Sequence, residues 1–222
     1  FIFVLPFIIS FCIFWIYPLF STVKMSFQSI LPNQVEWVGF EDYAKLLKDT
    51  AFHTAIKNSF VYMLLSLCLL IPFPMLYAVM IDSNIVKGKG LWKALLYLPA
   101  LTSVVISGTL FRLMFSEYST GQLNVILGWF GMDKIAWLKS GPTAMLALLV
   151  LASWRWTGVN MLYFLSGLKG IDGTLYESAE IDGAGAVKKF LHITLPLLKP
   201  TIIYVLTISI YGGLAMFLET YM

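Results

Sequence analysis

Long runs of uncharged, apolar residues recur along this chain, and they constrain its fold more than any other feature. A helix needs about 20 predominantly apolar residues to cross the hydrocarbon core of a bilayer. Five runs approach or reach this length, with polar intervals between them. We expect each run to cross the membrane once, and the expected spans are 1–23, 58–81, 94–115, 142–168 and 201–222.

The composition agrees with an integral membrane protein. Of the 222 residues, 59% are hydrophobic and 12% are charged, whereas soluble domains contain roughly 25% charged residues. The apolar runs lack the alternating polarity of barrel strands, so we expect an all-α, polytopic transmembrane helical bundle that forms one domain, 1–222. The net charge of +3 is too small to indicate nucleic-acid binding. Because the chain starts at Phe1 and ends inside an apolar run, we expect it to continue at both ends.

The cysteines, the histidines and the first apolar run do not indicate a disulfide, a metal site or a cleaved signal peptide. Cys12 and Cys68 lie in apolar runs, where we expect them to be small hydrophobic residues without a disulfide. His53 and His192 are far apart along the chain, and we expect no metal site. The first run is long for a signal peptide and lacks a small-residue cleavage site, so we predict a retained span.

The polar intervals contain shorter patterns. In 24–57, apolar residues at helical spacing predict a short helix at the membrane surface, and a second such helix is predicted within 117–141. Pro72 and Pro74 predict a kink in the second span, because proline cannot donate the helical hydrogen bond.

The longest charged run between two apolar runs covers 172–200, and it must be presented on one side of the membrane. Thr174 and Glu177 have the spacing of a capping box, which predicts the start of a short helix. Gly183 predicts the end of that helix, because glycine readily adopts the left-handed conformation. Thr194 and Pro196 predict the cap and first turn of the next helix. We interpret this segment as a docking surface for a partner.

The lysines indicate an orientation. Lys87, Lys89 and Lys93 fall on the same side as 172–200 if successive loops alternate across the membrane. The positive-inside rule then places this side in the cytoplasm. Lysines in the longer segments on the other side weaken this indication.

The docking segment resembles the EAA motif of binding-protein-dependent ABC importer permeases. The similar residues are Glu177-Ser178-Ala179, Asp182-Gly183-Ala184, Phe190, Ile193, Leu195-Pro196 and Pro200. Ser178 departs from the motif, which has alanine there. Outside the motif, the chain is similar to the sugar and oligosaccharide (maltose-type) branch at Trp37 to Tyr43, Asn58-Ser59, Leu98-Pro99 and Trp154.

The resemblance implies a type I ABC importer permease (MetI-like) fold in the cytoplasmic membrane of a prokaryote. It implies a second permease in a heterodimeric pair, two cytoplasmic ATPase subunits and an extracytoplasmic solute-binding protein. The implied ATPase-coupling residues are Leu175, Tyr176, Glu177, Ser178, Ala179, Asp182, Gly183 and Ala184. We expect Leu175, Tyr176 and Ala179 to face the ATPase.

We expect no cofactor in this chain, because ATP and Mg²⁺ would belong to the partner ATPase. Gly183 and Gly185 beside Lys188 do not have the spacing of a phosphate-binding loop. The chain also lacks an H-E-x-x-H pair and a G-x-S-x-G elbow, which disfavours an intramembrane enzyme.

Arg155 is the strongest candidate for contact with cargo, because a charge inside a span is costly. It lies between Trp154 and Trp156, and aromatic faces stack on sugar rings. Alternatively, Arg155 pairs with a carboxylate such as Glu219. The resemblance implies that the substrate path is lined by Ala100, Val104, Ala152, Arg155, Trp156, Val159, Tyr211, Gly212 and Met216.

The leading functional hypothesis is import of a sugar or oligosaccharide. The same machinery could instead carry an acidic oligosaccharide, a polyol or a glycerol phosphate, for which Arg155 would bind the anion.

Overall fold

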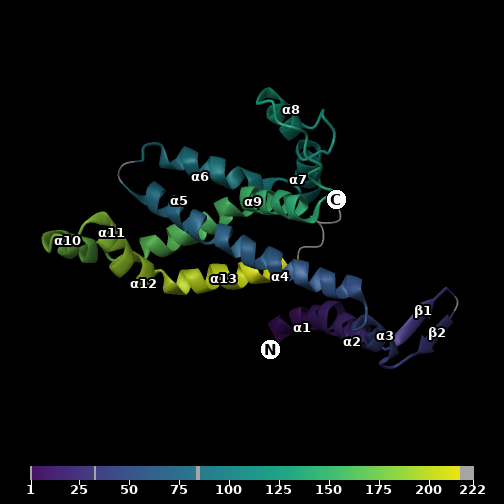
Figure 1. The fold of residues 1–222 in the computed structure, drawn as a ribbon. Coiled ribbons are helices and arrows are strands. Elements are labelled where there is room, and N and C mark those ends of the chain that lie inside the picture. The colour runs from purple at the N-terminus through teal and green to yellow at the C-terminus, as the bar shows by residue number, and fades with distance from the viewer. Residues whose placement is uncertain (1, 33, 84–85, 216–222) are drawn as a thin grey trace. The chain divides into compact units, whose positions relative to one another are not determined.

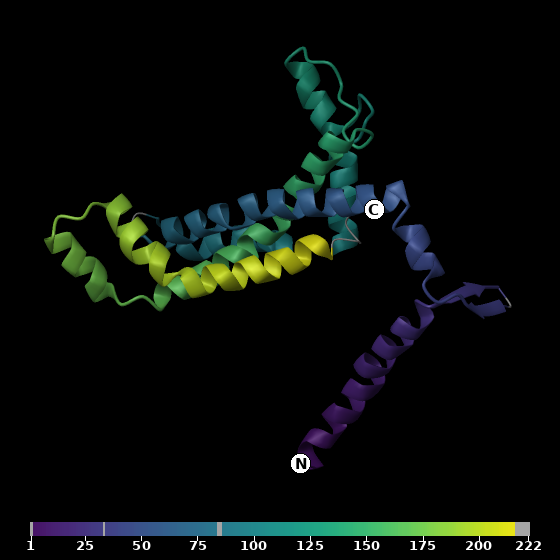
Figure 2. The same ribbon diagram turned by 60° about the horizontal axis from the view of Figure 1, so that its bottom comes forward.

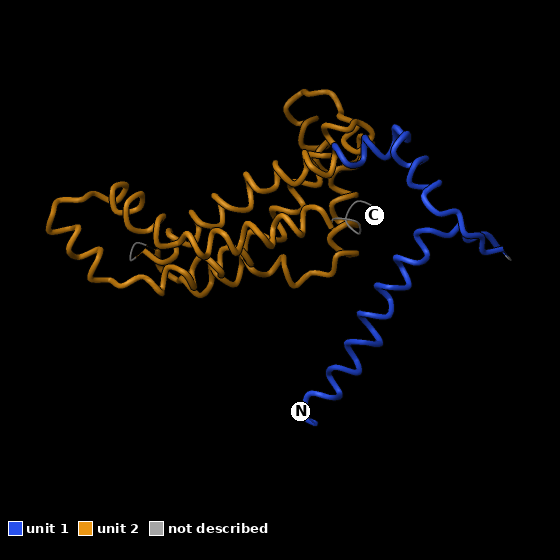
Figure 3. The backbone as a smooth tube through the Cα atoms, turned by 90° about the horizontal axis from the view of Figure 1, so that it is seen from below, with its two compact units in different colours: residues 1–57 blue, residues 58–222 orange. Residues whose placement is uncertain are grey.

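The computed structural model describes residues 2–32, 34–83 and 86–215. By its internal contacts the chain divides into two units, 1–57 and 58–222 (Figure 3). Within the described residues, three helices are long and apolar enough to cross a membrane, or five if two sharply bent pairs each count as one span.

The first unit begins with one apolar helix of 24 residues. It consists of the 3-10 turn η1 (Ile2–Val4), α1 (Leu5–Phe11), the π-helical segment η2 (Cys12–Ile16) and α2 (Tyr17–Met25). The widened π turn precedes Pro18, which lacks an N–H and crowds the carbonyl four residues earlier. None of the side chains of this helix is buried. A helix that is apolar all round requires lipid or other helices around it.

A small hairpin follows the first helix. Strands β1 (Gln28–Leu31) and β2 (Gln34–Trp37) pair antiparallel, with Gln28 opposite Trp37, and the short helix α3 (Glu41–Leu46) comes next. The Phe27 ring stacks on Trp37 with centroids 5.8 Å apart and also contacts Phe40. The surface helix was predicted, but the hairpin was not, because four-residue strands are too short for a clear alternating pattern.

In the second unit, α4 (Thr50–Leu70), which begins in the first unit, and α5 (Pro72–Asp82) form the second span. They break at Ile71, as the two prolines predicted. The expected third span, 94–115, is not one straight helix. Helix α6 (Lys89–Tyr97), the 3-10 turn η3 (Leu98–Leu101) and α7 (Val104–Met114) bend by 94°. Pro99 tightens the end of α6, and Thr102 then becomes extended (φ −75°, ψ 136°), which stops the helix.

Helix α8 (Gln122–Trp129) lies in the predicted 117–141 segment, and Asn124 organises the loops around it. The buried Asn124 Nδ2 donates to the carbonyls of Ser116, Tyr118 and Ile135. Its Oδ1 accepts from the Ile135 N–H and from Trp137 Nε1, each at 3.0 Å.

Helix α9 (Gly141–Lys169) packs against α5, α6 and α13 (Figure 1). Beyond it lie α10 (Gly173–Ile181), α11 (Ala186–Lys189), the π segment η4 (Phe190–Thr194), α12 (Leu195–Leu197) and α13 (Lys199–Leu214). The chain bends by 66° where α13 begins. The main core of buried side chains joins α5, α9 and α13, and it consists of Ala78, Ile81, Met161, Phe164, Leu165, Leu168, Leu198 and Val205.

The two ends of the second unit carry different elements. Helices α10 and α11 lie at the same end as the last turn of α5 and the first turn of α6, whereas α7 and α8 lie at the opposite end (Figures 1 and 2). The lysine-bearing start of α6 and the 172–200 segment are therefore on one side, as the alternation of loops predicts.

Candidate functional site

The N-cap of helix α10 lies two residues earlier than the capping-box prediction placed it. Asp172 is its N-cap, and its Oδ1 accepts from the Thr174 N–H at 3.0 Å. This hydrogen bond favours the charged form, so the pKa of Asp172 lies below its ordinary value. The prediction of Thr174 as the cap was wrong, because the carboxylate of Asp172 accepts from a free N–H group of the first turn and interacts favourably with the helix dipole.

The end of α10 agrees with the prediction. Gly183 has φ +76°, and its N–H donates to the Glu180 carbonyl at 3.0 Å. The Ala184 N–H donates to the Ala179 carbonyl at 2.8 Å. These two bonds form the Schellman motif that closes helices at a left-handed glycine.

One face of α10 lies against the chain's own bundle. The half-buried Tyr176 has its hydroxyl 2.9 Å from Oγ1 of Thr194, which is buried. Ala179 is also half-buried, so Tyr176 and Ala179 are less accessible to a partner than Leu175 is, and their contact with the ATPase remains a prediction. Thr194 does not cap a new helix, because the helical chain continues from Ala186 through a π turn into α12. Pro196 accounts for that widened turn, since it cannot donate to the carbonyl four residues earlier.

The exposed apolar residues of this segment were only partly predicted. Leu175 is 45% exposed, and Ile181 at 88% and Val187 at 72%, which were not among the predicted coupling residues, are more exposed. Glu180 and Lys189 form an ion pair of 3.4 Å that links α10 to α11. We call Ile181 and Val187 the exposed pair. Of the remaining predicted coupling residues, Glu177, Ser178, Asp182 and Gly183 are exposed and Ala184 is half-buried.

A cavity of about 410 Å³ lies between α4, α9 and α13. Its lining combines aromatic rings, hydroxyls, an amide and one guanidinium. The lining residues are Tyr62, Ser66, Leu70, Leu151, Ala152, Arg155, Trp156, Asn160, Ile208, Ser209, Tyr211, Gly212, Gly213 and Ala215.

Five of the predicted path residues meet in this cavity, namely Ala152, Arg155, Trp156, Tyr211 and Gly212. Ala100, Val104 and Val159 do not line it, and Met216 lies outside the described residues. Ala100 and Val104 are displaced because η3 packs on another face of α9 and the chain then bends away. The turn of α9 brings Asn160 to the cavity in place of Val159.

The polar groups of the cavity come from three helices. The Arg155 guanidinium lies 5.8 Å from the centroid of the Trp156 ring, in a cation–π arrangement. Asn160, Ser66 and Ser209 are buried, and Asn160 Nδ2 donates to the Leu70 carbonyl at 2.9 Å. Sequence reasoning missed these three side chains, although a polar residue inside an apolar span is the signal that finds them. Glu219, the suggested partner of Arg155, lies outside the described residues.

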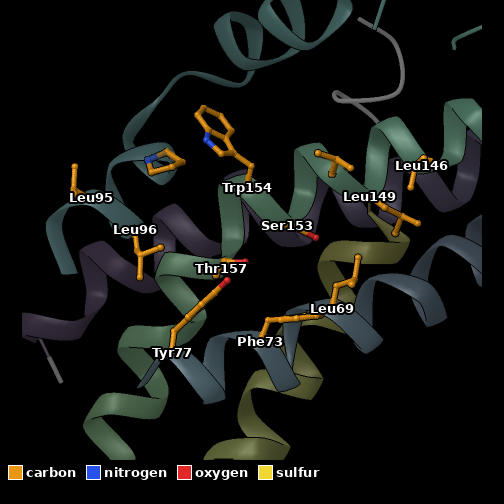
Figure 4. Close-up of a pocket in the computed structure, with 12 residues that line it drawn as sticks. Leu69, Phe73, Tyr77, Leu95, Leu96, Leu146, Leu149, Ser153, Trp154 and Thr157 are labelled. Atoms are coloured by element: carbon orange, nitrogen blue, oxygen red, sulfur yellow. The ribbon is translucent and has the colours of Figure 1, made fainter. Parts of the chain in front are cut away.

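A second cavity of about 520 Å³ opens on another face of α9 (Figure 4). Leucines and Phe73 line most of it, the hydroxyls of Tyr77, Ser153 and Thr157 lie on its walls, and none of its described lining side chains is charged. Trp154 borders it and contacts the Phe111 ring with centroids 5.5 Å apart, which agrees with the packing role expected for Trp154.

Metal-binding and disulfide chemistry have little support in the described parts of the chain. No group of three or more His, Cys, Asp or Glu side chains there has an arrangement that could hold a metal ion. Cys12 and Cys68 are both free and exposed.

The helical fold, the capped segment at one end and the polar cavity between spans define a membrane component of a transporter. Residues 58–222 match the family described as "Binding-protein-dependent transport system inner membrane component", and the chain belongs to this family. It is therefore a multi-pass membrane protein of the ABC importer permease class, with the fold that the sequence predicted.

Individual relatives are more specific. The chain is 48% identical over 221 residues to the arabinooligosaccharides transport system permease protein AraP of Bacillus subtilis, with 100% of this chain and 70% of the relative covered. It is 47% identical over 216 residues to AraP of Halalkalibacterium halodurans, with 97% and 68% covered. A crystal structure of a bacterial ABC transporter involved in import of the acidic polysaccharide alginate matches with a TM-score of 0.85 and 32% identity, covering 96% of this chain and 72% of the matched chain.

Proposed function

We propose that this chain is the translocation subunit of an ATP-driven importer that carries a neutral oligosaccharide across the cytoplasmic membrane of a prokaryote. The main evidence for this class of cargo is the 48% identity to an arabinooligosaccharide permease over the whole chain. The mixed lining of the cavity supports it, because a few convergent polar groups among apolar and aromatic walls are typical of small-molecule sites.

The cavity has the chemistry that a sugar requires. Trp156 and Tyr211 are exposed aromatic side chains at its edge, and their faces suit the apolar faces of sugar rings. Arg155 offers planar N–H donors to hydroxyls. Ser66 and Ser209 add hydroxyls from α4 and α13. Cargo would therefore be held by stacking and by a small number of hydrogen bonds.

The 172–200 segment would connect this cavity to ATP hydrolysis in a partner subunit. Helix α10 begins shortly after α9 ends, and α13 begins at the end of the same segment, so the segment is covalently joined to two walls of the cavity. The exposed pair and Leu175 offer apolar anchors of the kind that insert into a groove of a partner. We assign this end of the bundle to the cytoplasm, where the lysines near the start of α6 support the orientation.

The other partners follow from the family. A solute-binding protein would deliver cargo on the opposite side, and one related transporter has been crystallised with its alginate-bound periplasmic protein. A second permease would complete the transport path, and two ATPases would bind the paired coupling segments. No cofactor of this chain itself is proposed.

An acidic oligosaccharide is the second candidate. It is favoured by the positive charge of Arg155 in the cavity and by the likeness to an alginate importer. Under this proposal Arg155 binds a carboxylate through paired hydrogen bonds.

Competition for uptake distinguishes the two cargo classes. The assembled complex in proteoliposomes, with its binding protein, should accumulate arabinan oligosaccharides in an ATP-dependent manner. Unlabelled neutral oligosaccharide should compete and oligouronate should not. Replacing Arg155→Gln should reduce this uptake less than tenfold, and Arg112→Gln on α7 serves as the matched control. Competition by oligouronate, together with loss of uptake in Arg155→Gln alone, would instead establish the acidic cargo.

A further inference from the structure

The break in the second span leaves a backbone carbonyl that the helix cannot satisfy. In a regular helix the Leu70 carbonyl accepts from the N–H four residues later, at position 74. Pro74 has no N–H, and the chain at Ile71 departs from helical geometry with φ −104° and ψ −61°. Leu70 is 6% exposed, and a buried carbonyl without a donor is costly.

Asn160 of α9 supplies the missing donor. Its Nδ2 lies 2.9 Å from the Leu70 carbonyl oxygen, although the two residues are 90 positions apart in the sequence. The same Nδ2 lies 3.5 Å from Oγ of Ser209 on α13. The orientation of the amide follows from chemistry, because a carbonyl accepts hydrogen bonds and therefore requires the NH₂ group of asparagine.

Asn160 thus joins the three helices that form the cavity. Leu70, Asn160 and Ser209 all line it, and they come from α4, α9 and α13. Asn160 is only 4% exposed, and its Nδ2 has protein acceptors at 2.9 Å, the Leu70 carbonyl, and at 3.5 Å, the Ser209 hydroxyl. The NH₂ group thus faces protein acceptors on two helices, which distinguishes Asn160 from the more exposed Trp156.

We propose that Asn160 is a positioning residue for transport. Its amide holds the proline break of the second span against α9 and α13, and in this way it sets the shape of the cavity in which cargo binds. This inference rests on the proposed transport function, but it concerns a residue that binds helices and does not touch the cargo. The hydrogen bond from Asn160 to the Leu70 carbonyl replaces the helical hydrogen bond that Pro74 removes.

A pair of substitutions tests this role. Asn160→Asp keeps the size of the side chain and replaces the NH₂ donor with a carboxyl oxygen, which in its ionised form can only accept. In proteoliposomes that contain the whole complex, it should raise the half-saturating cargo concentration at least tenfold, measured per assembled complex. Pro74→Ala restores an N–H four residues after Leu70. In the Pro74→Ala background, Asn160→Asp should therefore raise the half-saturating cargo concentration less than threefold. Ser107→Ala removes a buried hydroxyl that donates to the carbonyl of Ser103, the N-cap of α7, and it should leave uptake unchanged.

Each other outcome overturns the proposal. Wild-type uptake by Asn160→Asp would show that the amide is not needed. An equal loss in both backgrounds would show that Asn160 acts on the cargo or in another way. If Asn160→Asp does not assemble, Pro74→Ala must restore assembly, and failure to do so contradicts the proposal. The assembly and the melting temperature of the Asn160→Asp complex are measured without cargo. They therefore test the positioning role of Asn160 even if the wild-type complex imports no oligosaccharide.

Discussion

The Tyr176 hydroxyl lies 2.9 Å from Oγ1 of Thr194, and this contact joins the helix α10 to the chain that leads into α13. Because Tyr176 turns toward the bundle, Ile181, five positions later, is left 88% exposed at the end of α10. The contact therefore determines which side of α10 a partner meets.

Removing this hydroxyl should loosen α10. A single hydrogen bond contributes about 0.5–1.5 kcal/mol net, so Tyr176→Phe should speed amide exchange in α10 by roughly 2- to 12-fold. Thr194→Val should have a similar effect, and the double variant should add little to either change. Tyr118→Phe, at a tyrosine that is 66% exposed, is the control. Fully additive effects of the two substitutions would contradict a direct bond between them.

The Asp172 cap gives α10 a dependence on pH. The pKa of Asp172 is lowered in the folded chain, so its stabilising effect is complete above the unfolded pKa of about 3.9 and is lost as the pH falls through the lower folded value. At pH 7, Asp172→Ala should therefore speed exchange of the amides in the first turn of α10. Asp172→Asn should retain most of the protection, because its amide oxygen also accepts hydrogen bonds. An Asp172→Ala variant that exchanges like the wild type at pH 7 would exclude the cap.

Gly183 and Gly185 form a matched pair for testing the end of α10. Gly183 has φ +76°, whereas Gly185 is extended with φ −69° and ψ 169°. Gly183→Ala should destabilise the segment by roughly 1–2 kcal/mol, the cost of a side chain in the left-handed region. Gly185→Ala should have little effect, since an added Cβ there meets open space. Equal changes in local exchange for both variants would argue against the Schellman motif.

Gly158 should be required for close packing of α6 on α9. An added Cβ at this position overlaps with the Leu96 backbone carbonyl, which cannot move as a side chain does. Gly158→Ala should lower the stability of the bundle by about 1–3 kcal/mol or more, measured as the melting temperature in detergent. Gly128→Ala in α8 meets open space and should be neutral or slightly stabilising. A Gly158→Ala variant as stable as the wild type would show that α6 does not pack on α9 in this way.

The parts of the fold that sequence predicts well are those decided by local chemistry. The apolar runs mark the helices, Pro72 and Pro74 mark the break at Ile71, and Gly183 marks the end of α10. The N-cap was assigned to Thr174 because Thr174 and Glu177 have the spacing of a capping box, whereas the acceptor in the structure is the carboxylate of Asp172.

The features that sequence did not predict depend on contacts between distant segments. Tyr176 turns inward because Thr194 lies opposite it, and this choice leaves Ile181 outside. Asn160 enters the cavity because Leu70 lacks a donor, a relationship across 90 positions. Ala100 was placed on the substrate path by the family resemblance, and the bend of 94° after η3 is not evident from the sequence.

The central claim is that ATP drives cargo through this chain by way of the exposed pair at the end of the bundle. ATP-dependent uptake of arabinan oligosaccharides by proteoliposomes that contain the whole complex tests it most directly. Ile181→Glu should reduce uptake at least tenfold while the permease remains inserted and assembled with its second permease, and Ile181→Leu should retain it. Uptake that needs no ATP, or wild-type uptake by Ile181→Glu, would contradict the claim.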